Sequence, residues 1–147
     1  MSKKKDWVYY GIFFSEEMKR NILAYTEKLM DKFTCPSDHR FKFNEDWKIY
    51  CDHVTITYND CTEVSQLIAN YYKNRIGEKV ILSVIGIGIS DKAVALEVDY
   101  KTKNEHSHIT VATAPDVNPY ESNNIKNWYK VRLFAIEGTI GKYPKNN

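Results

Sequence analysis

The sequence predicts an α+β protein in which a curved antiparallel sheet forms a groove and helices pack on its outer face. Several short stretches alternate in character and are rich in β-branched residues, which is typical of half-buried strands. Two longer stretches carry apolar residues at helical spacing behind a capping residue. With 147 residues the chain has the length of one domain, and we expect a single domain over residues 1–147 with a flexible basic tail at residues 1–6.

The composition excludes several functional classes. Hydrophobic residues make up 43% of the chain and aromatic residues 14%, which argues against disorder. The net charge of +2 is too small for binding duplex DNA by charge alone, although it permits a small anionic ligand in a local groove. Three cysteines fit no disulfide framework, and the chain has no signal peptide and no long apolar run. We therefore expect a soluble, cytoplasmic protein that does not bind membranes and whose oligomeric state is left open.

The expected elements follow from local periodicity and capping. Ser15 and Thr62 are good N-cap residues, and the helices behind them end near Phe33 and Gly77. The apolar stripe of the second helix is expected to comprise Val64, Leu67, Ile68, Tyr71 and Tyr72. The predicted strands span residues 7–14, 52–58, 79–89, 93–100, 107–113 and 131–140, and a loop at residues 115–127 is expected near the groove.

A short motif occurs twice on these strands. Asp52-His53-Val54-Thr55-Ile56-Thr57-Tyr58 is echoed by Ser107-His108-Ile109-Thr110-Val111-Ala112-Thr113. Because strand side chains alternate, each histidine shares a face with the threonine two positions on, and the apolar residues occupy the opposite face. If both strands lie in one sheet, His53, Thr55, His108 and Thr110 therefore meet in a common polar groove.

These residue types suit the cleavage of a phosphodiester. An imidazole has an unperturbed pKa near ~6.5, so one histidine can accept a proton while the other donates one at neutral pH. The threonine hydroxyls can bond the non-bridging phosphate oxygens, on which charge builds during the reaction. This chemistry requires no metal or other cofactor. The sequence leaves open which histidine is the acid and which is the base.

Simpler interpretations compete for some of these residues. Either histidine alone would be read as an ordinary surface or core histidine, and threonine is a good strand former. Cys35, His39 and Cys51 together with His53 could be imagined as a zinc set, but their spacing matches no familiar structural site. The repetition of both residue types at identical offsets favours the catalytic interpretation.

Two further residues are expected in the groove as substrate-binding residues. Tyr9 lies opposite Val8 and Ile12 in its strand, where its ring could stack on a nucleobase. Glu137 shares a face with Ala135 and Thr139, where its carboxylate could accept a hydrogen bond from a base amino group. An alternative for Glu137 is a strand-edge residue paired with a lysine.

The paired H-x-T motifs, the opening strand Tyr9-Tyr10-Gly11-Ile12-Phe13-Phe14 and the closing Glu137-Gly138-Thr139-Ile140-Gly141 resemble the two-histidine (2H) phosphoesterase superfamily. Within it the chain looks most similar to phage anti-CBASS phosphodiesterases, which destroy cyclic di- and trinucleotide signals of bacterial immunity. The resemblance implies a metal-independent hydrolase of cyclic oligonucleotides acting in the host cytoplasm if the chain is phage-encoded. Two alternatives remain: an RNA 2′,3′-cyclic or 2′-5′ phosphodiesterase of RNA repair or processing, and a protein that binds or sequesters a nucleotide or short RNA without cleaving it.

Overall fold

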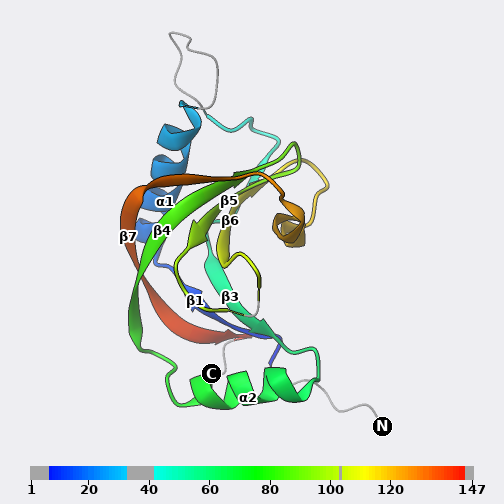
Figure 1. Ribbon diagram of the computed structural model, residues 1–147. Coiled ribbons are helices and arrows are strands. Elements are labelled where there is room, and N and C mark those ends of the chain that lie inside the picture. Colours follow the sequence, from blue (N-terminus) through cyan, green and yellow to red (C-terminus); the bar gives the residue numbers. More distant parts are fainter. Residues whose placement is uncertain (1–6, 33–41, 103, 145–147) are drawn as a thin grey trace.

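The strands of the computed structural model form a closed ring, as Figure 1 shows for the described residues 7–32, 42–102 and 104–144. The elements in chain order are β1 (Tyr9–Phe13), α1 (Glu16–Met30), β2 (Lys48–Ile49), β3 (His53–Tyr58), α2 (Glu63–Lys73), β4 (Lys79–Ile89), β5 (Ala93–Val98), β6 (His108–Thr113), the 3-10 helix η1 (Pro119–Asn124) and β7 (Trp128–Tyr143). The sheet has the order β2-β6-β3-β1-β7-β4-β5, and a further pairing of β5 with β6 closes all of these strands except β2 into a ring. All these pairings are antiparallel. The predicted α+β class and curved antiparallel sheet are therefore confirmed, whereas closure into a ring was not predicted.

Closure depends on the last strand, which is longer than the sequence predicts. The prediction placed it at residues 131–140, but β7 runs from Trp128 to Tyr143. Its C-terminal end pairs with β1, and most of its length pairs with β4. The register with β4 shifts between Val84 and Gly86, which is a bulge that bends the strand. One bent strand thus joins the two halves of the sheet, and the ring leaves fewer unpaired strand edges.

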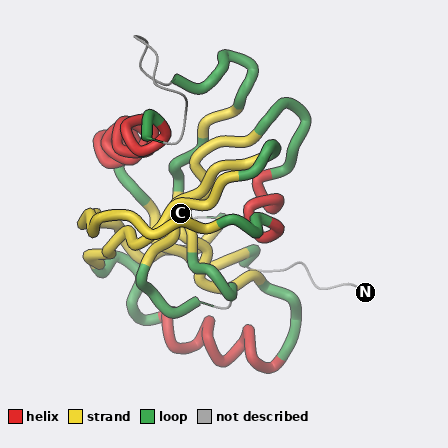
Figure 2. The backbone as a smooth tube through the Cα atoms, turned by 45° about the horizontal axis from the view of Figure 1, so that its top comes forward, coloured by secondary structure: helices red, strands yellow, loops and turns green. Residues whose placement is uncertain are grey.

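Both helices lie outside the ring of strands, and Figure 2 shows the same arrangement from a second direction. The hydroxyl of Ser15 accepts a hydrogen bond from the backbone N–H of Met18, and that of Thr62 from Ser65, so both predicted N-caps are confirmed. The buried residues of α1 and α2 join one apolar core with the buried strand residues Ile12, Val54, Ile56, Ile109 and Val111. This core occupies the face of the motif strands that the sequence predicted to be buried.

The buried side of α2 agrees with the prediction in part. Tyr72 is buried and Ile68 packs against the core as predicted, but Val64, Leu67 and Tyr71 are exposed, and Ser65 and Ala69 are buried instead. Small residues at positions 65 and 69 let the helix approach the sheet closely, and the hydroxyl of Tyr72 is hydrogen-bonded to that of Tyr100 at 2.7 Å. Close packing therefore outweighs the hydrophobicity of the other side of the helix. Within the described residues, no helix is long and apolar enough to cross a membrane.

Candidate active site

The two motif strands lie side by side in the sheet. β3 pairs antiparallel with β6, and Val54 is the partner of Ile109. In an antiparallel ladder this register places His53 opposite Thr110, and Thr55 opposite His108. The chain before β3 continues the contact, since the backbone N–H of Cys51 donates to the carbonyl of Thr110 at 3.0 Å. Each histidine therefore faces the threonine of the other motif.

All four motif side chains line one cavity of about 260 Å³. Tyr9 also lines this cavity, as predicted, together with residues that were not predicted for the site. Those further residues are Tyr50, Asp52, Tyr58, Asn104, Pro119, Tyr120 and Asn123. The structure thus brings together in one cavity the four side chains that were predicted to meet there: His53, Thr55, His108 and Thr110.

His53 is held between a hydroxyl and a group of aromatic rings. Its Nε2 atom lies 3.0 Å from the Oγ1 atom of Thr55. The ring of Tyr9 stacks on the imidazole at 4.7 Å between centroids, and that of Phe13 at 5.6 Å. The pKa of His53 is lowered to about 4, mainly by burial; the carboxylate of Asp52 acts to raise it, and the nearby His108 and Lys19 act to lower it. His53 is therefore neutral at pH 7 in the free protein.

His108 is held through its other ring nitrogen. Its Nδ1 atom lies 2.8 Å from the backbone carbonyl oxygen of His106. Because a carbonyl oxygen only accepts hydrogen bonds, Nδ1 carries the proton, and a neutral His108 has an unprotonated Nε2. Burial lowers the pKa of His108, whereas the hydrogen bond to His106 and the carboxylate of Glu97 act to raise it.

Thr110 connects the site to η1. Its Oγ1 atom lies 2.8 Å from the hydroxyl oxygen of the buried Ser122 and donates to the carbonyl of Pro119 at 3.3 Å. This connection brings Tyr120 and Asn123 to the cavity. The sequence placed the loop at residues 115–127 near the groove, which is confirmed. No pattern in the sequence indicated Tyr120 or Asn123 individually, because a contact between a strand and a distant turn does not depend on neighbouring residues.

Tyr9 lies in the cavity, but its ring faces are engaged by protein. The Tyr9 ring packs against His53, Phe13 and Tyr143 with interplanar angles of 19°, 21° and 13° respectively. Its pKa is raised, mainly by burial and then by Tyr58 and Asp52. The hydroxyl is therefore a neutral donor at the edge of the cavity.

Glu137 is not among the residues that line this cavity. Its Oε1 atom lies 3.6 Å from the Nζ atom of Lys79, and both side chains are largely exposed. The register explains the difference. Thr139 is paired with Phe13 at the end of β1, and Glu137 lies two positions earlier in β7, beyond the end of β1, where the partner strand is β4. Glu137 is therefore a strand residue paired with a lysine, which is the alternative stated for it in the sequence analysis.

Two members of the imagined zinc set, Cys51 and His53, lie within the described residues. Cys51 is buried in the apolar core, where burial raises the pKa of its thiol to about 12. Cys35 and His39 lie outside the described residues. Among the residues that are described, no group of three or more His, Cys, Asp or Glu side chains is arranged to hold a metal ion.

Neither a protein-family model nor a curated protein sequence matches the chain. In three dimensions the chain is similar to the crystal structure of a fungal RNA kinase, with a TM-score of 0.57 at 15% sequence identity. The superposition covers 97% of this chain and 47% of that one, so the chain spans about half of the solved structure that it matches. At this identity the likeness is one of fold, and the fold that it supports is the curved antiparallel sheet with few helices.

Proposed function

We propose that the chain is a metal-independent phosphodiesterase of the two-histidine type that cleaves cyclic di- or trinucleotide signals. The observation that carries this proposal is the convergence of His53, Thr55, His108 and Thr110 on one cavity. Two imidazoles and two hydroxyls supply an acid, a base and donors for the phosphate oxygens. The anti-CBASS role in immune evasion rests on the resemblance of the motifs alone.

The surroundings of the two histidines favour different roles. The pKa of His53, at about 4, keeps it neutral and suited to accept a proton. His108 donates from Nδ1 to the carbonyl of His106 and lies near Glu97, and both partners stabilise an imidazolium. We therefore assign His53 as the base and His108 as the acid.

The reaction then balances without a metal. His53 takes the proton of a ribose 2′-hydroxyl, and the 2′-oxygen attacks the adjacent phosphorus. The P–O5′ bond breaks, and the leaving oxygen takes the proton from His108. The product carries a 2′,3′-cyclic phosphate, which water opens in a second step with the roles of the two histidines reversed.

A bound phosphate adds negative charge next to the two histidines. None of the described residues that line the cavity is a lysine or an arginine, and the neighbouring Lys19 is paired with Asp52 at 3.1 Å, so a protonated imidazole is the cation that the cavity lining itself can offer the ligand. The negative phosphate raises the pKa of both histidines by the same attraction. Substrate binding thus promotes the protonation of His108 that the acid step needs.

A second candidate is a phosphodiesterase that acts on RNA 2′,3′-cyclic ends or on 2′-5′ linkages. The likeness of fold to a fungal RNA kinase favours this candidate, because the same cavity would accept the end of an RNA strand. A protein that sequesters a nucleotide without cleaving it would use the same cavity for binding and would show no turnover.

Incubation of the purified protein with cyclic dinucleotides, cyclic trinucleotides and RNA with 2′,3′-cyclic ends tests these possibilities. We expect cleavage of a cyclic oligonucleotide that survives excess chelator, and a loss of roughly 10²–10⁴-fold or more in rate for His53→Ala and for His108→Ala. Asn21→Ala, on the exposed side of α1, is the matched control. Cleavage of the RNA alone would establish the second candidate, and tight binding without cleavage would establish sequestration.

A further inference from the structure

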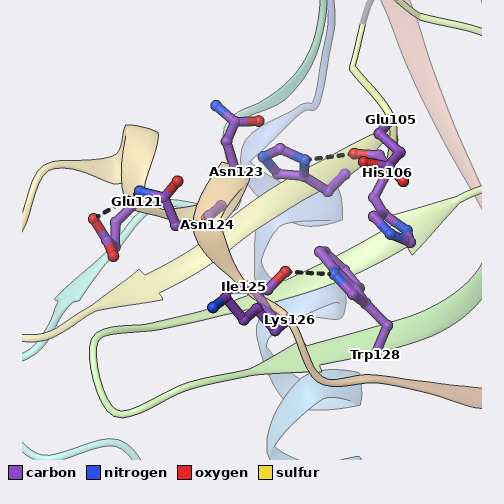
Figure 3. A pocket seen from close by; sticks show the side chains of 10 residues that line it. Glu105, His106, Glu121, Asn123, Asn124, Ile125, Lys126 and Trp128 are labelled. Carbon is purple, nitrogen blue, oxygen red and sulfur yellow. Dashed lines mark hydrogen bonds between the residues drawn. The ribbon is translucent and has the colours of Figure 1, made fainter.

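A second and larger cavity adjoins the candidate active site at His108. It has a volume of about 650 Å³ and shares His108 and Asn123 with the smaller cavity. Figure 3 shows the side chains that line the larger cavity, among them His106, Asn123 and Trp128. We propose that this larger cavity binds the nucleoside that leaves in the reaction, and that it prefers a base with an exocyclic amino group. The proposal rests on the proposed function of the site, because that function makes His108 the acid for the leaving oxygen.

An aromatic pair forms one wall of the larger cavity. The imidazole of His106 stacks on the indole of Trp128, with 4.7 Å between centroids and 14° between planes. The indole is fixed in place, since its Nε1 atom donates to the carbonyl of Ile125 at 2.9 Å and a Cβ atom on Gly88 would lie only 2.7 Å from two of its carbons. Trp128 is therefore held by protein groups, and we expect a base to stack on His106.

The ring of His106 is also held at its edge. Its Nδ1 atom lies 2.8 Å from the Oε2 atom of Glu97, and its side chain remains 38% exposed. A ring that is fixed by a carboxylate and by an indole loses little freedom when a base stacks on it. Stacking of this kind is how proteins commonly hold unpaired bases.

The polar groups of the larger cavity suit a base and not a phosphate. Glu105 and Glu121 line it, against one lysine, Lys126. Two carboxylates repel a phosphate, but they accept hydrogen bonds from the exocyclic amino groups of adenine, cytosine or guanine, which uracil lacks. Asn123 adds an amide with both donors and an acceptor. The scissile phosphate is expected in the smaller cavity because both histidines that its cleavage needs line that cavity, and the leaving nucleoside is expected in the larger one.

The position of His108 connects the two cavities. It lines both, and its backbone partner is the carbonyl of His106, whose side chain forms the aromatic wall. A phosphate next to His53 and His108 thus has its leaving oxygen at the acid, and the nucleoside on that oxygen extends toward His106. This places the wall beside the leaving group and away from the attacking hydroxyl.

Binding measured by calorimetry in the His53→Ala background tests this inference, since His53 does not line the larger cavity. The probes are 2′-O-methyl dinucleoside monophosphates, which cannot cyclise, with adenosine or uridine at the 5′-linked position. We expect adenosine to bind more tightly than uridine, and His106→Ala to weaken adenosine binding roughly 5- to 100-fold, as for the loss of one stacking contact. His106→Phe should retain most of the affinity, and Asn21→Ala all of it.

Two outcomes would overturn the subsite. One is equal binding of adenosine and uridine together with an unaltered affinity in His106→Ala, and the other is an unaltered affinity and base preference in both Asn123→Ala and Glu121→Gln. The subsite and the proposed function fail separately. A wild-type protein without turnover whose base binding is lost in His106→Ala retains the subsite and refutes the phosphodiesterase. A wild-type protein that turns over, but whose KM and base preference are unaltered in His106→Ala, retains the phosphodiesterase and refutes the subsite.

Discussion

The ring of Tyr9 stacks on the imidazole of His53, with 4.7 Å between the centroids and 19° between the planes. This contact covers one side of an imidazole whose pKa burial lowers to about 4. Tyr9 is therefore a positioning residue for His53, in addition to any contact that it makes with a ligand.

Replacing Tyr9 tests this relationship. Tyr9→Ala should expose the imidazole to water, so that the pKa of His53 rises toward its ordinary value of ~6.5 and the acidic limb of kcat/KM moves to higher pH. Tyr9→Phe keeps the ring and should leave the limb in place. If Tyr9→Ala raises KM without moving the limb, the tyrosine contacts the ligand's base instead, as the sequence predicted.

The two lowered pKa values also predict the pH profile of the wild-type protein. A base with a pKa of about 4 and an acid whose pKa lies below its ordinary value place the maximum of kcat/KM below pH ~6.5. In kcat, which reports the bound state, both limbs should lie at higher pH, because the bound phosphate stabilises each imidazolium. Steady-state rates between pH 4 and pH 9 measure both profiles, and coincident profiles would contradict the effect of the phosphate.

The free energy of unfolding should depend on pH through His53. The pKa of His53 is lower in the folded state than in the unfolded chain, so the unfolded chain binds more protons between pH ~6.5 and pH 4. Its contribution to the free energy of unfolding is present above pH ~6.5 and is lost as the pH falls toward 4, by up to about 3 kcal/mol. Urea unfolding at the two pH values should show a smaller loss for His53→Gln than for the wild type, and a wild-type loss for Asn21→Ala.

The two threonines should differ when their hydroxyls are removed. Thr55→Val keeps the shape of the side chain and should lower kcat by roughly 10²-fold, as expected for the loss of one donor to the reacting oxygens. Thr110→Val should cost more, because it also removes the hydrogen bond to Ser122 that holds η1. Ser122→Ala separates the two effects, since it loses the contact between Thr110 and Ser122 and keeps the hydroxyl of Thr110 with its bond to Pro119. An unchanged rate in Thr55→Val would assign that threonine to strand formation only.

Glu137 should contribute little to catalysis. Its exposed pair with Lys79 contributes at most about 1 kcal/mol to folding. We therefore expect Glu137→Gln to leave kcat/KM and the preference among bases unchanged. A change in base preference without a change in kcat would place part of the substrate on this distal part of β7.

Local patterns in the sequence determined the elements and the faces of the motif strands. Alternation placed Val54 and Ile56 on the buried face and His53 and Thr55 on the polar one, because side-chain direction in a strand has a period of two. Capping by Ser15 and Thr62 likewise depends on residues within one helical turn. The four motif residues could be proposed as one site because both motifs repeat the same local pattern.

The tertiary structure alone decided what surrounds those residues. The register of β3 against β6, the bent β7 that closes the ring and the turn η1 held by Thr110 and Ser122 all join segments that are distant in the chain. Glu137 shows the consequence: its face on β7 follows from alternation, but its distance from the groove depends on where β1 ends and β4 takes over as the partner. The larger cavity beside His108 is a further case, since His106, Asn123 and Trp128 meet there only because the sheet closes. Alternation and capping act over a few residues, whereas pairing between distant strands depends on how the whole sheet packs.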